Sequence, residues 1–324
     1  MLLKDSIAAD GRNCCAASLE LLRLYSLYKI AFVHPLSLAC VSDRFKVFFQ
    51  YLLPKQAITA FAGFVASRQR GWVTTALIRW FVGKYAVNMS EAANSDITSY
   101  LSFNDFFTRA LKPEARPLAS AAWICPVDGA ISQFGRIEDD QIFQAKGHLY
   151  STTALVGGDA PLAEQFQHGS FATIYLSPRD YHRIHMPCDG RLLRMIYVPG
   201  DLFSVNPFTA RGVPGLFARN ERLVCVFETP NGPMVLTLVG ATIVGSMATV
   251  WHGVVNRSRQ NTVREWHYAD ATPPLTLKKG DEMGRFLLGS TVVLLFPVGP
   301  LQFNPDWQAG GPVQLGQAMA TAGG

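Results

Sequence analysis

Two histidines stand three residues apart in one polar stretch, Tyr181-His182-Arg183-Ile184-His185-Met186-Pro187. Imidazole exchanges a proton near neutral pH more readily than other side chains, so a close pair of histidines indicates acid–base chemistry. A single histidine more often only satisfies local hydrogen bonds. That structural interpretation is weaker here, because the pair stands among Arg179, Asp180 and Arg183.

A metal site is the first alternative for this stretch. His182, His185 and Cys188 lie at three-residue spacing and carry the nitrogen and sulfur ligands that zinc prefers. Pro187 resists the helix that would align them, and the sequence offers no obvious further ligands. The six cysteines form no Cys-x-x-Cys pair, so we expect no metal and a reducing, cytoplasm-facing compartment.

A second candidate is Asp128, in Cys125-Pro126-Val127-Asp128-Gly129. An aspartate before a glycine is common in hairpin turns and is ordinarily explained by the turn alone. Asp189-Gly190 has the same local pattern. Local reasoning therefore does not choose between Asp128 and Asp189.

The third candidate interrupts an apolar run, GRFLLGSTVVLLF, at residues 284–296. The run predicts one strand of a β-sheet core, with Gly289-Ser290-Thr291 as a small polar island in its middle. Taken alone, such an island indicates a bulge or a close backbone contact.

Most of the chain has the pattern of short strands. These strands must position the candidate residues. From about Ile124 onward, apolar runs alternate with turn signals, and the clearest strands are 171–176, 223–227 and 234–239. The predicted fold class is α+β: a mainly antiparallel β catalytic body with an N-terminal amphipathic helical region. The last fifteen or so residues, rich in Gly and Ala, are expected to be loose.

Before the predicted strands lie segments in which apolar residues recur at helical spacing. We expect helices over 44–53, over 56–69 with Ile58, Phe61 and Val65 on one face, and after Gly71 with Trp80 and Phe81 on one face. Between residues 43 and 84 there are seven basic residues, which suits the surface of an anionic membrane. The alternative, equally open at this point, is that these faces pack on the body and the charges are solvated.

Charge and hydropathy exclude several classes of protein. A formal net charge of +5 is too small to indicate nucleic-acid binding. The most apolar N-terminal segment, 19–41, carries Glu20, Arg23, Lys29 and Pro35, so it predicts neither a membrane span nor a secretory signal. We treat residues 1–41 as an N-terminal extension of unknown role.

Five motifs occur together in the order and approximate spacing of the bacterial phosphatidylserine decarboxylases: FNDFFTR at 103–109, PVDG at 126–129, YHRIHMP at 181–187, PGDLFSVN at 199–206 and LGST at 288–291. Several long motifs in fixed order are far more specific than any one of them. The sequence strongly resembles that family from about Arg44 to about Leu315.

The resemblance implies a proenzyme that cuts itself between Gly289 and Ser290 into a β chain, 1–289, and an α chain, 290–324. It implies that Asp128, His185 and Ser290 form a charge relay for this cleavage, with His185 as the base and Asp128 orienting it. Ser290 would become a covalent pyruvoyl group that forms a Schiff base with the substrate amine. His182 would assist the decarboxylation. The family motif thus selects Asp128 over Asp189.

The implied activity is decarboxylation of phosphatidylserine to phosphatidylethanolamine and carbon dioxide, in phospholipid biosynthesis. Because the implied substrate is a lipid, the helices at 42–100 are interpreted as a membrane-associating region. This region precedes a β-rich catalytic domain, 101–324. The implied place is the cytoplasmic face of the cell membrane, peripherally bound, as a homodimer of processed protomers. On charge grounds alone, Tyr181 and the segment 109–116 are candidates for contact with the lipid phosphate.

Two rival functions remain at this point. A serine hydrolase could use the same Asp128, His185 and Ser290 on an external substrate, but no Gly-x-Ser-x-Gly motif surrounds Ser290. A non-catalytic membrane-binding β domain would need only a structural role for the Gly-Ser-Thr island. Self-cleavage at Gly289-Ser290 distinguishes both rivals from the decarboxylase.

Overall fold

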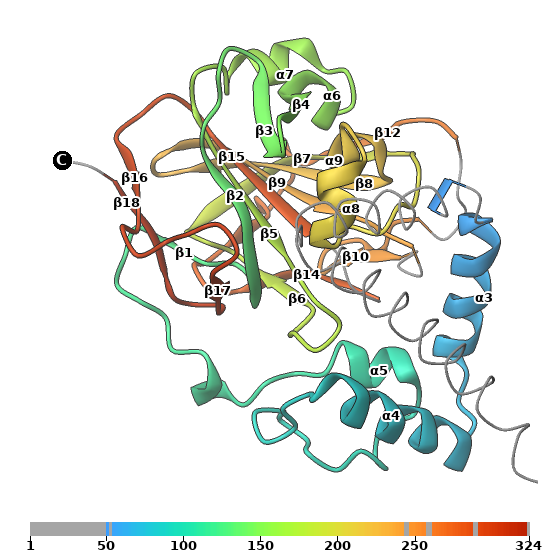
Figure 1. Cartoon of the computed structure of the whole chain (residues 1–324). Helices are drawn as coiled ribbons and strands as arrows, with labels where there is room; N and C mark the ends of the chain where they lie inside the picture. The colour runs from blue at the N-terminus through green and yellow to red at the C-terminus, as the bar shows by residue number, and fades with distance from the viewer. Residues whose placement is uncertain (1–49, 52–53, 243–245, 257–260, 288–290, 323–324) are drawn as a thin grey trace, which may run out of the picture. The chain divides into compact units, whose positions relative to one another are not determined.

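The computed structural model describes residues 50–51, 54–242, 246–256, 261–287 and 291–322. Residues 52–324 group into one unit by their contacts, and residues 1–51 into another. The strands fall into four sheets in which all ladders between named strands are antiparallel, as Figure 1 shows for the largest of them. The predicted α+β class with a mainly antiparallel body is confirmed.

The largest sheet has nine strands and forms the core of the body. Its order is β12-β7-β8-β9-β15-β5-β2-β17, with β13 also paired to β7. The strands are β2 (Gly129–Arg136), β5 (Ser170–Tyr175), β7 (Gly190–Val198), β8 (Arg222–Thr229), β9 (Gly232–Val239), β12 (Arg264–His267), β13 (Thr276–Leu277), β15 (Thr291–Phe296) and β17 (Pro312–Val313). All six residues of β15 are buried, which explains the continuous apolar run in this segment.

Three smaller sheets complete the body. One has the order β11-β10-β14-β6, a second β1-β18-β16, and the third is the hairpin β3-β4. Their strands are β1 (Trp123–Ile124), β3 (Gln141–Ala145), β4 (His148–Ser151), β6 (Arg183–His185), β10 (Met247–Thr249), β11 (Gly253–Val254), β14 (Glu282–Phe286), β16 (Leu301–Phe303) and β18 (Ala318–Ala322).

Two sequence expectations are wrong here. The run GRFLLGSTVVLLF is not one strand: β14 pairs with β6 and β10, whereas β15 pairs with β5 and β9 in the large sheet. The run is apolar throughout because its two halves are buried in two different sheets. The C-terminal residues are not loose either, since β18 pairs with both β1 and β16.

Short helices cover the body, and longer ones precede it. The short ones are α6 (Thr152–Leu155), α7 (Ala160–Glu164), α8 (Pro207–Gly212), α9 (Leu216–Arg219) and the 3-10 turn Pro113–Ala115. Before the body come α3 (Lys55–Ser67), α4 (Trp72–Tyr85) and α5 (Phe103–Phe107). The helices expected at 56–69 and after Gly71 are confirmed, while most of the helix expected at 44–53 lies outside the described residues.

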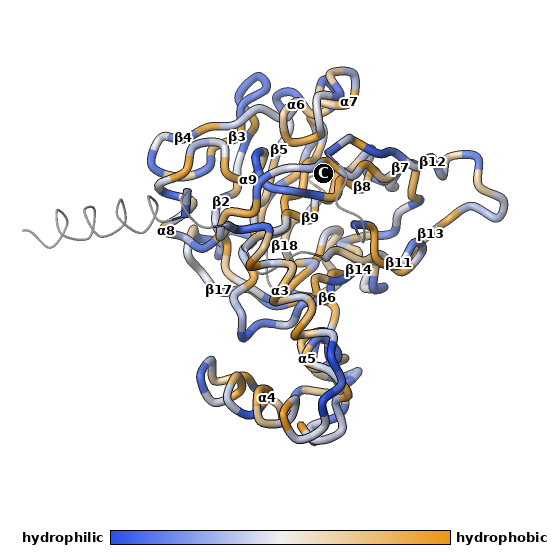
Figure 2. Tube along the Cα trace, turned by 90° about the vertical axis from the view of Figure 1, so that its right-hand side faces the viewer, coloured by the Kyte–Doolittle hydropathy of each residue, from blue (hydrophilic) through white to orange (hydrophobic). Residues whose placement is uncertain are grey.

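The helices α3 and α4 both pack on α5, and α4 and α5 lie together in Figures 1 and 2. Of the expected apolar faces, the one in α3 is not buried, with Ile58 half-buried and Phe61 and Val65 exposed, and the one in α4 is buried only in part. In α3 the side chain of Phe61 is 70% exposed, and in α4 those of Trp72 and Trp80 are 81% and 58% exposed. Phe81, in contrast, is buried against the phenylalanines of α5. No helix in the described part of the chain is long and apolar enough to span a bilayer.

Candidate active site

The loop that follows β5 brings the predicted residues to the end of the large sheet. It leaves the sheet after Tyr175, carries His182, and ends in β6, which contains His185. The backbone N–H of His185 donates to the carbonyl of Pro126 at 2.9 Å, two residues before Asp128. The N–H of Phe286, at the end of β14, donates to the carbonyl of His182 at 3.0 Å. Backbone hydrogen bonds therefore join two of the five motifs to each other and to the strand that precedes the motif at 288–291.

His185 has a fixed tautomer in this structure. Its Nδ1 lies 2.8 Å from the carbonyl oxygen of Gly280, and because a carbonyl only accepts, Nδ1 carries the proton. Burial lowers the pKa of His185, and the Gly280 carbonyl opposes this only in part. The ring is therefore neutral at physiological pH, with Nε2 free of a proton and able to accept one.

Tyr181 occupies that accepting nitrogen. Its hydroxyl lies 3.0 Å from Nε2 of His185 and donates to it. The ring of Tyr181 is 5% exposed, and burial raises its pKa to about 12, so the phenol stays protonated. Tyr181 and the Gly280 carbonyl thus hold the imidazole of His185 from both sides.

His182 is more deeply buried than His185 and has one unused nitrogen. Its exposed fraction is 0%, and its Nδ1 donates to the carbonyl of Asp180 at 2.7 Å. Its Nε2 has no hydrogen-bond partner among the described residues. Burial lowers the pKa of His182 to about 3, so the unused nitrogen is a neutral acceptor.

The carboxylate of Asp128 is held by an arginine and a backbone amide. Arg116 donates to it from Nε at 2.9 Å and from a terminal nitrogen at 2.6 Å, and the N–H of Leu315 donates at 2.9 Å. The same arginine also forms an ion pair with Glu91 at 2.8 Å. These contacts with Asp128 and Glu91 raise the pKa of Arg116 despite its partial burial.

No direct hydrogen bond between Asp128 and His185 is present in the described part of the chain. The negative charge of Asp128 still raises the pKa of His185, although less than the Gly280 carbonyl and Glu282 do. Asp128 therefore favours a positive charge on His185 through space, while the Gly280 carbonyl sets the ring orientation. That Asp128 orients His185 directly stays a prediction.

The two Asp-Gly pairs differ in their surroundings, which local sequence reasoning did not reveal. Asp128 is 6% exposed, and a Cβ on Gly129 would lie 2.3 Å from the carbonyl oxygen of Tyr175, so only glycine fits beside β5. Asp189 is partly exposed and accepts hydrogen bonds from Lys278 and from the N–H of Lys279. Asp189 is thus bound to a lysine pair distant in the sequence, and the choice of Asp128 over Asp189 as the functional residue stays a prediction.

Gly289 and Ser290, the predicted cleavage site, lie outside the described residues. The nearest described residues are Leu287 before them and Thr291 after them. Phe286 is bonded to His182, and Thr291 is paired with Tyr175 and Val239. The hydroxyl of Thr291 is buried without a hydrogen-bond partner among the described residues. The chain thus enters and leaves the cleavage segment at the strands that frame the histidine loop.

Three residues of this arrangement had weak or no sequence signals. Glu91 stands in no motif, and Gly280 was noted only as part of a Lys-Gly turn. Arg116 was grouped with the candidates for lipid phosphate, yet its guanidinium is engaged with Asp128, Glu91 and the carbonyl of Ala115. The only prior signal for Arg116 was its charge, which does not indicate a partner.

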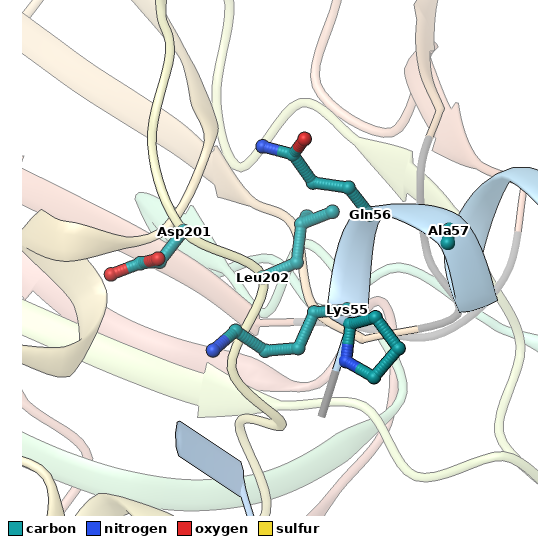
Figure 3. Close-up of a pocket in the computed structure, with 6 residues that line it drawn as sticks. Lys55, Gln56, Ala57, Asp201 and Leu202 are labelled. Carbon is teal, nitrogen blue, oxygen red and sulfur yellow. The ribbon is translucent and has the colours of Figure 1, made fainter. Parts of the chain in front are cut away.

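One surface pocket lies away from this site. It measures about 460 Å³ and lies between the start of α3 and the segment after β7 (Figure 3). Its lining residues are Pro54, Lys55, Gln56, Ala57, Asp201 and Leu202. None of the candidate catalytic residues lines it. Within the described residues, no group of three or more His, Cys, Asp or Glu side chains is placed to hold a metal ion.

Comparisons with known proteins agree with the motifs. Residues 103–321 match the family model described as phosphatidylserine decarboxylase, and residues 45–86 match a model described as PSD. A phosphatidylserine decarboxylase proenzyme of Polaromonas naphthalenivorans (strain CJ2) is 78% identical over 281 residues, which is 86% of this chain and 97% of the relative. The proenzyme of Variovorax paradoxus (strain S110) is 74% identical over 280 residues, covering 86% and 98%.

A more distant relative shows the same coverage. The phosphatidylserine decarboxylase proenzyme of Dechloromonas aromatica (strain RCB) is 68% identical over 281 residues, which is 87% of this chain and 99% of the relative. The family model alone covers well over half of the chain. The family identification made from the five motifs is thereby confirmed. The chain belongs to the phosphatidylserine decarboxylase family.

Proposed function

We propose that this protein decarboxylates phosphatidylserine to phosphatidylethanolamine and carbon dioxide, after cutting itself between Gly289 and Ser290. The family match and the proenzyme names of the relatives support the activity and the processing. The observation that carries the proposal is the pair of neutral histidines, His182 fully buried and His185 half-buried, which lie beside β14 where the chain enters the cleavage segment.

In self-cleavage, Ser290 attacks the carbonyl carbon of Gly289 while His185 takes the hydroxyl proton. The peptide bond is exchanged for an ester, which undergoes β-elimination and leaves the β chain with a free carboxylate. The dehydroalanine left at position 290 reacts with water, releasing ammonia and yielding the pyruvoyl group. Because a positive charge develops on His185, the nearby carboxylate of Asp128 stabilises the first step.

For His185 to act on Ser290, the proton must reach its Nε2, which Tyr181 contacts. Tyr181 either moves aside or passes its own proton to His185 as it receives one from the serine. The Gly280 carbonyl keeps the ring in place during either route, since it contacts the opposite nitrogen.

The pyruvoyl group supplies a carbonyl that accepts the electrons released when carbon dioxide leaves. The surroundings of position 290 suit such a group. Thr291 offers a buried hydroxyl without a described partner, and His182 offers an unprotonated, buried Nε2. The burial of His182 and its unused nitrogen support a role in handling a proton during decarboxylation.

Mass spectrometry of the denatured protein tests the processing. We expect a fragment that begins at position 290 with a pyruvoyl end, and uncut chain for Ser290→Ala and for His185→Ala. His182→Ala should be cut normally but should release little carbon dioxide from phosphatidylserine. A homogeneous intact chain in an active preparation would overturn the cleavage, and normal processing of His185→Ala would overturn its role as the base.

The helices before the body suggest how the enzyme reaches its substrate. A diacyl lipid must be taken from a bilayer, and Phe61, Trp72 and Trp80 are exposed on helices of which α4 also carries Arg79 and Lys84. We extend the proposal to a membrane-associating region at 42–100, preceding a catalytic domain at 101–324, at the cytoplasmic face of the cell membrane. A homodimer of processed protomers stays a prediction from the family resemblance.

A further inference from the structure

Arg109 is a buried cation without an ionic partner. It follows α5, is 5% exposed, and no carboxylate of the described residues lies within ion-pair distance of it. Its Nε has no hydrogen-bond partner among those residues, and one terminal nitrogen lies 3.5 Å from the carbonyl oxygen of Arg179, at the limit of a hydrogen bond. The guanidinium otherwise lies over the ring of Phe106, 5.4 Å from its centre.

A second buried arginine shows what a structural role looks like in this fold. Arg222 is 3% exposed, and each of its three nitrogens donates to a backbone carbonyl, of Leu155, Asn220 or Ala154. Arg109 has no comparable set of acceptors. The charges of Asp128 and Glu91 act on Arg109 only from beyond ion-pair distance, and its Nε has no described acceptor. Because burying a cation with so few contacts is costly, Arg109 indicates an anion that is bound during function.

The neighbourhood of Arg109 is the histidine loop. Phe107, two residues before Arg109, packs on the ring of His182 with 4.1 Å between ring centres. The positive charge of Arg109 also contributes to the lowered pKa of His182, after the larger effect of burial. One buried donor and one buried neutral acceptor, both without described partners, therefore lie close together.

The substrate of the proposed reaction carries two anionic groups, and they have different fates. The carboxylate loses its charge when it leaves as carbon dioxide, so an ion pair to it would stabilise the ground state and slow the reaction. The phosphodiester keeps its charge from substrate to product, and arginine is the side chain best suited to grip it. We propose, on the basis of the proposed function, that Arg109 binds the phosphodiester of the lipid headgroup and so presents the serine moiety to His182.

Kinetics with matched variants test this role. Arg109→Gln should cut itself at position 290 as the unmodified protein does, because Arg109 contacts none of the residues proposed for self-cleavage. Its KM for phosphatidylserine should rise about 10- to 100-fold with kcat changed far less, since an interaction equal in substrate and transition state is lost. Arg109→Lys should fall between the two. Arg179→Gln, an exposed arginine of the adjoining loop, is the matched control and should leave KM unchanged.

Glycerophosphoethanolamine distinguishes the phosphodiester from the carboxylate, because it has the first and lacks the second. Calorimetry should show that Arg109→Gln weakens its binding by about the same factor as the rise in KM. An unchanged KM, or a raised KM with undiminished binding of this compound, would overturn the proposal. If Arg109→Gln does not fold, Arg109→Lys gives the same comparison. If the unmodified protein releases no carbon dioxide, the proposed function fails, while the binding comparison still decides the role of Arg109.

Discussion

His182 and His185 stand three residues apart, yet the hydrogen bonds of their ring nitrogens differ. His185 has both nitrogens engaged, by the Gly280 carbonyl and the Tyr181 hydroxyl. His182 has one nitrogen engaged and the other buried without a described partner. A residue that must accept a proton in a fixed direction needs an orienting contact, and one that must meet a substrate needs a vacant atom.

The burial of His182 predicts acid sensitivity of the fold. Its folded pKa of about 3 lies below the ordinary value of 6.5, so between these values the unfolded state binds a proton that the folded state does not. Stability contributed in this way is complete above pH 6.5 and falls as the pH drops toward 3. For His182→Asn, we expect the loss of unfolding free energy between about pH 7.5 and about pH 5 to be about 2 kcal/mol smaller than for the unmodified protein.

Urea unfolding of both proteins at the two pH values measures this difference. Other titrating groups affect both proteins alike, so the difference isolates His182. An equal loss in the two proteins would show that His182 does not titrate as its burial predicts.

Arg116 is predicted to stabilise the fold through Asp128. Removing one member of a buried ion pair leaves the other charge uncompensated, which costs about 3–5 kcal/mol. Arg116→Gln should therefore lower the free energy of unfolding by about 3 kcal/mol and slow self-cleavage, because Asp128 loses its position.

Lys278→Gln provides the control for Arg116→Gln. It breaks the ion pair of Lys278 with Asp189, whose side chains are 77% and 45% exposed. Such exposed pairs contribute about 0–1 kcal/mol, so stability and processing should change little. Equal effects of the two substitutions on the unfolding free energy would contradict the role given to Arg116.

At the residue scale, the sequence was enough to identify the candidate residues but not their hydrogen-bond and ion-pair partners. Asp128, His182 and His185 stand in recognisable motifs, whereas a partner of Asp128 is Arg116, which also binds Glu91, and a partner of His185 is a backbone carbonyl. A carbonyl has no residue signature, and a lone glutamate looks like any surface charge. The burial that separates Asp128 from Asp189 depends on strands far away in the sequence, such as the one that ends at Tyr175.

At the scale of elements, α4 and α5 are joined to the histidine loop by aromatic rings. Phe81 of α4 lies 5.0 Å from Phe103 and 6.0 Å from Phe107, and Phe107 packs on His182. The face of α4 that carries Phe81 is therefore committed to this cluster. The exposed remainder of α4, with Trp72 and Trp80, is left for another surface.

We expect that exposed side to bind anionic membranes. Replacing Trp72 and Trp80 together by Glu adds two negative charges and removes two large apolar rings, so binding to phosphatidylserine-containing liposomes in flotation should fall by at least about tenfold. Leu149→Glu, an exposed apolar residue of the β3-β4 hairpin, is the control and should float normally. Unchanged flotation of the tryptophan variant, or of a protein lacking residues 1–87, would contradict the membrane-associating role.

The strands predicted from the sequence are correct where a whole segment belongs to one sheet. The strands expected at 171–176, 223–227 and 234–239 correspond to β5, β8 and β9. The hydropathy of each segment was enough to predict that its side chains are buried. The prediction failed at GRFLLGSTVVLLF, since hydropathy records that both halves are buried and not which sheet buries each one. The order of the strands, with β15 between β9 and β5, depends on pairing between distant segments and is not visible in local pattern.

At the scale of the whole molecule, the proposed α chain is integrated into the β chain. The strand β15 lies between β9 and β5, with ladders to both, and β17 and β18 pair with β2 and β1. The N–H of Leu315 also binds Asp128 across the proposed division. We predict that the two chains stay together after cleavage. Native mass spectrometry should give the mass of both, and the fragment from 290 should appear alone only after denaturation.

Because β15 lies inside the large sheet, the proposed cleavage makes refolding after denaturation harder than the first folding. The uncut precursor folds as a single chain, so the strand meets its partners in an intramolecular reaction. Once the bond is cut, a denatured enzyme would have to recover the same strand from solution, with an efficiency that depends on protein concentration and competes with aggregation of the exposed β9 and β5. If the proposed cleavage occurs, the cut enzyme is therefore kinetically trapped in its native state, and its useful lifetime is set by a rate of unfolding rather than by an equilibrium.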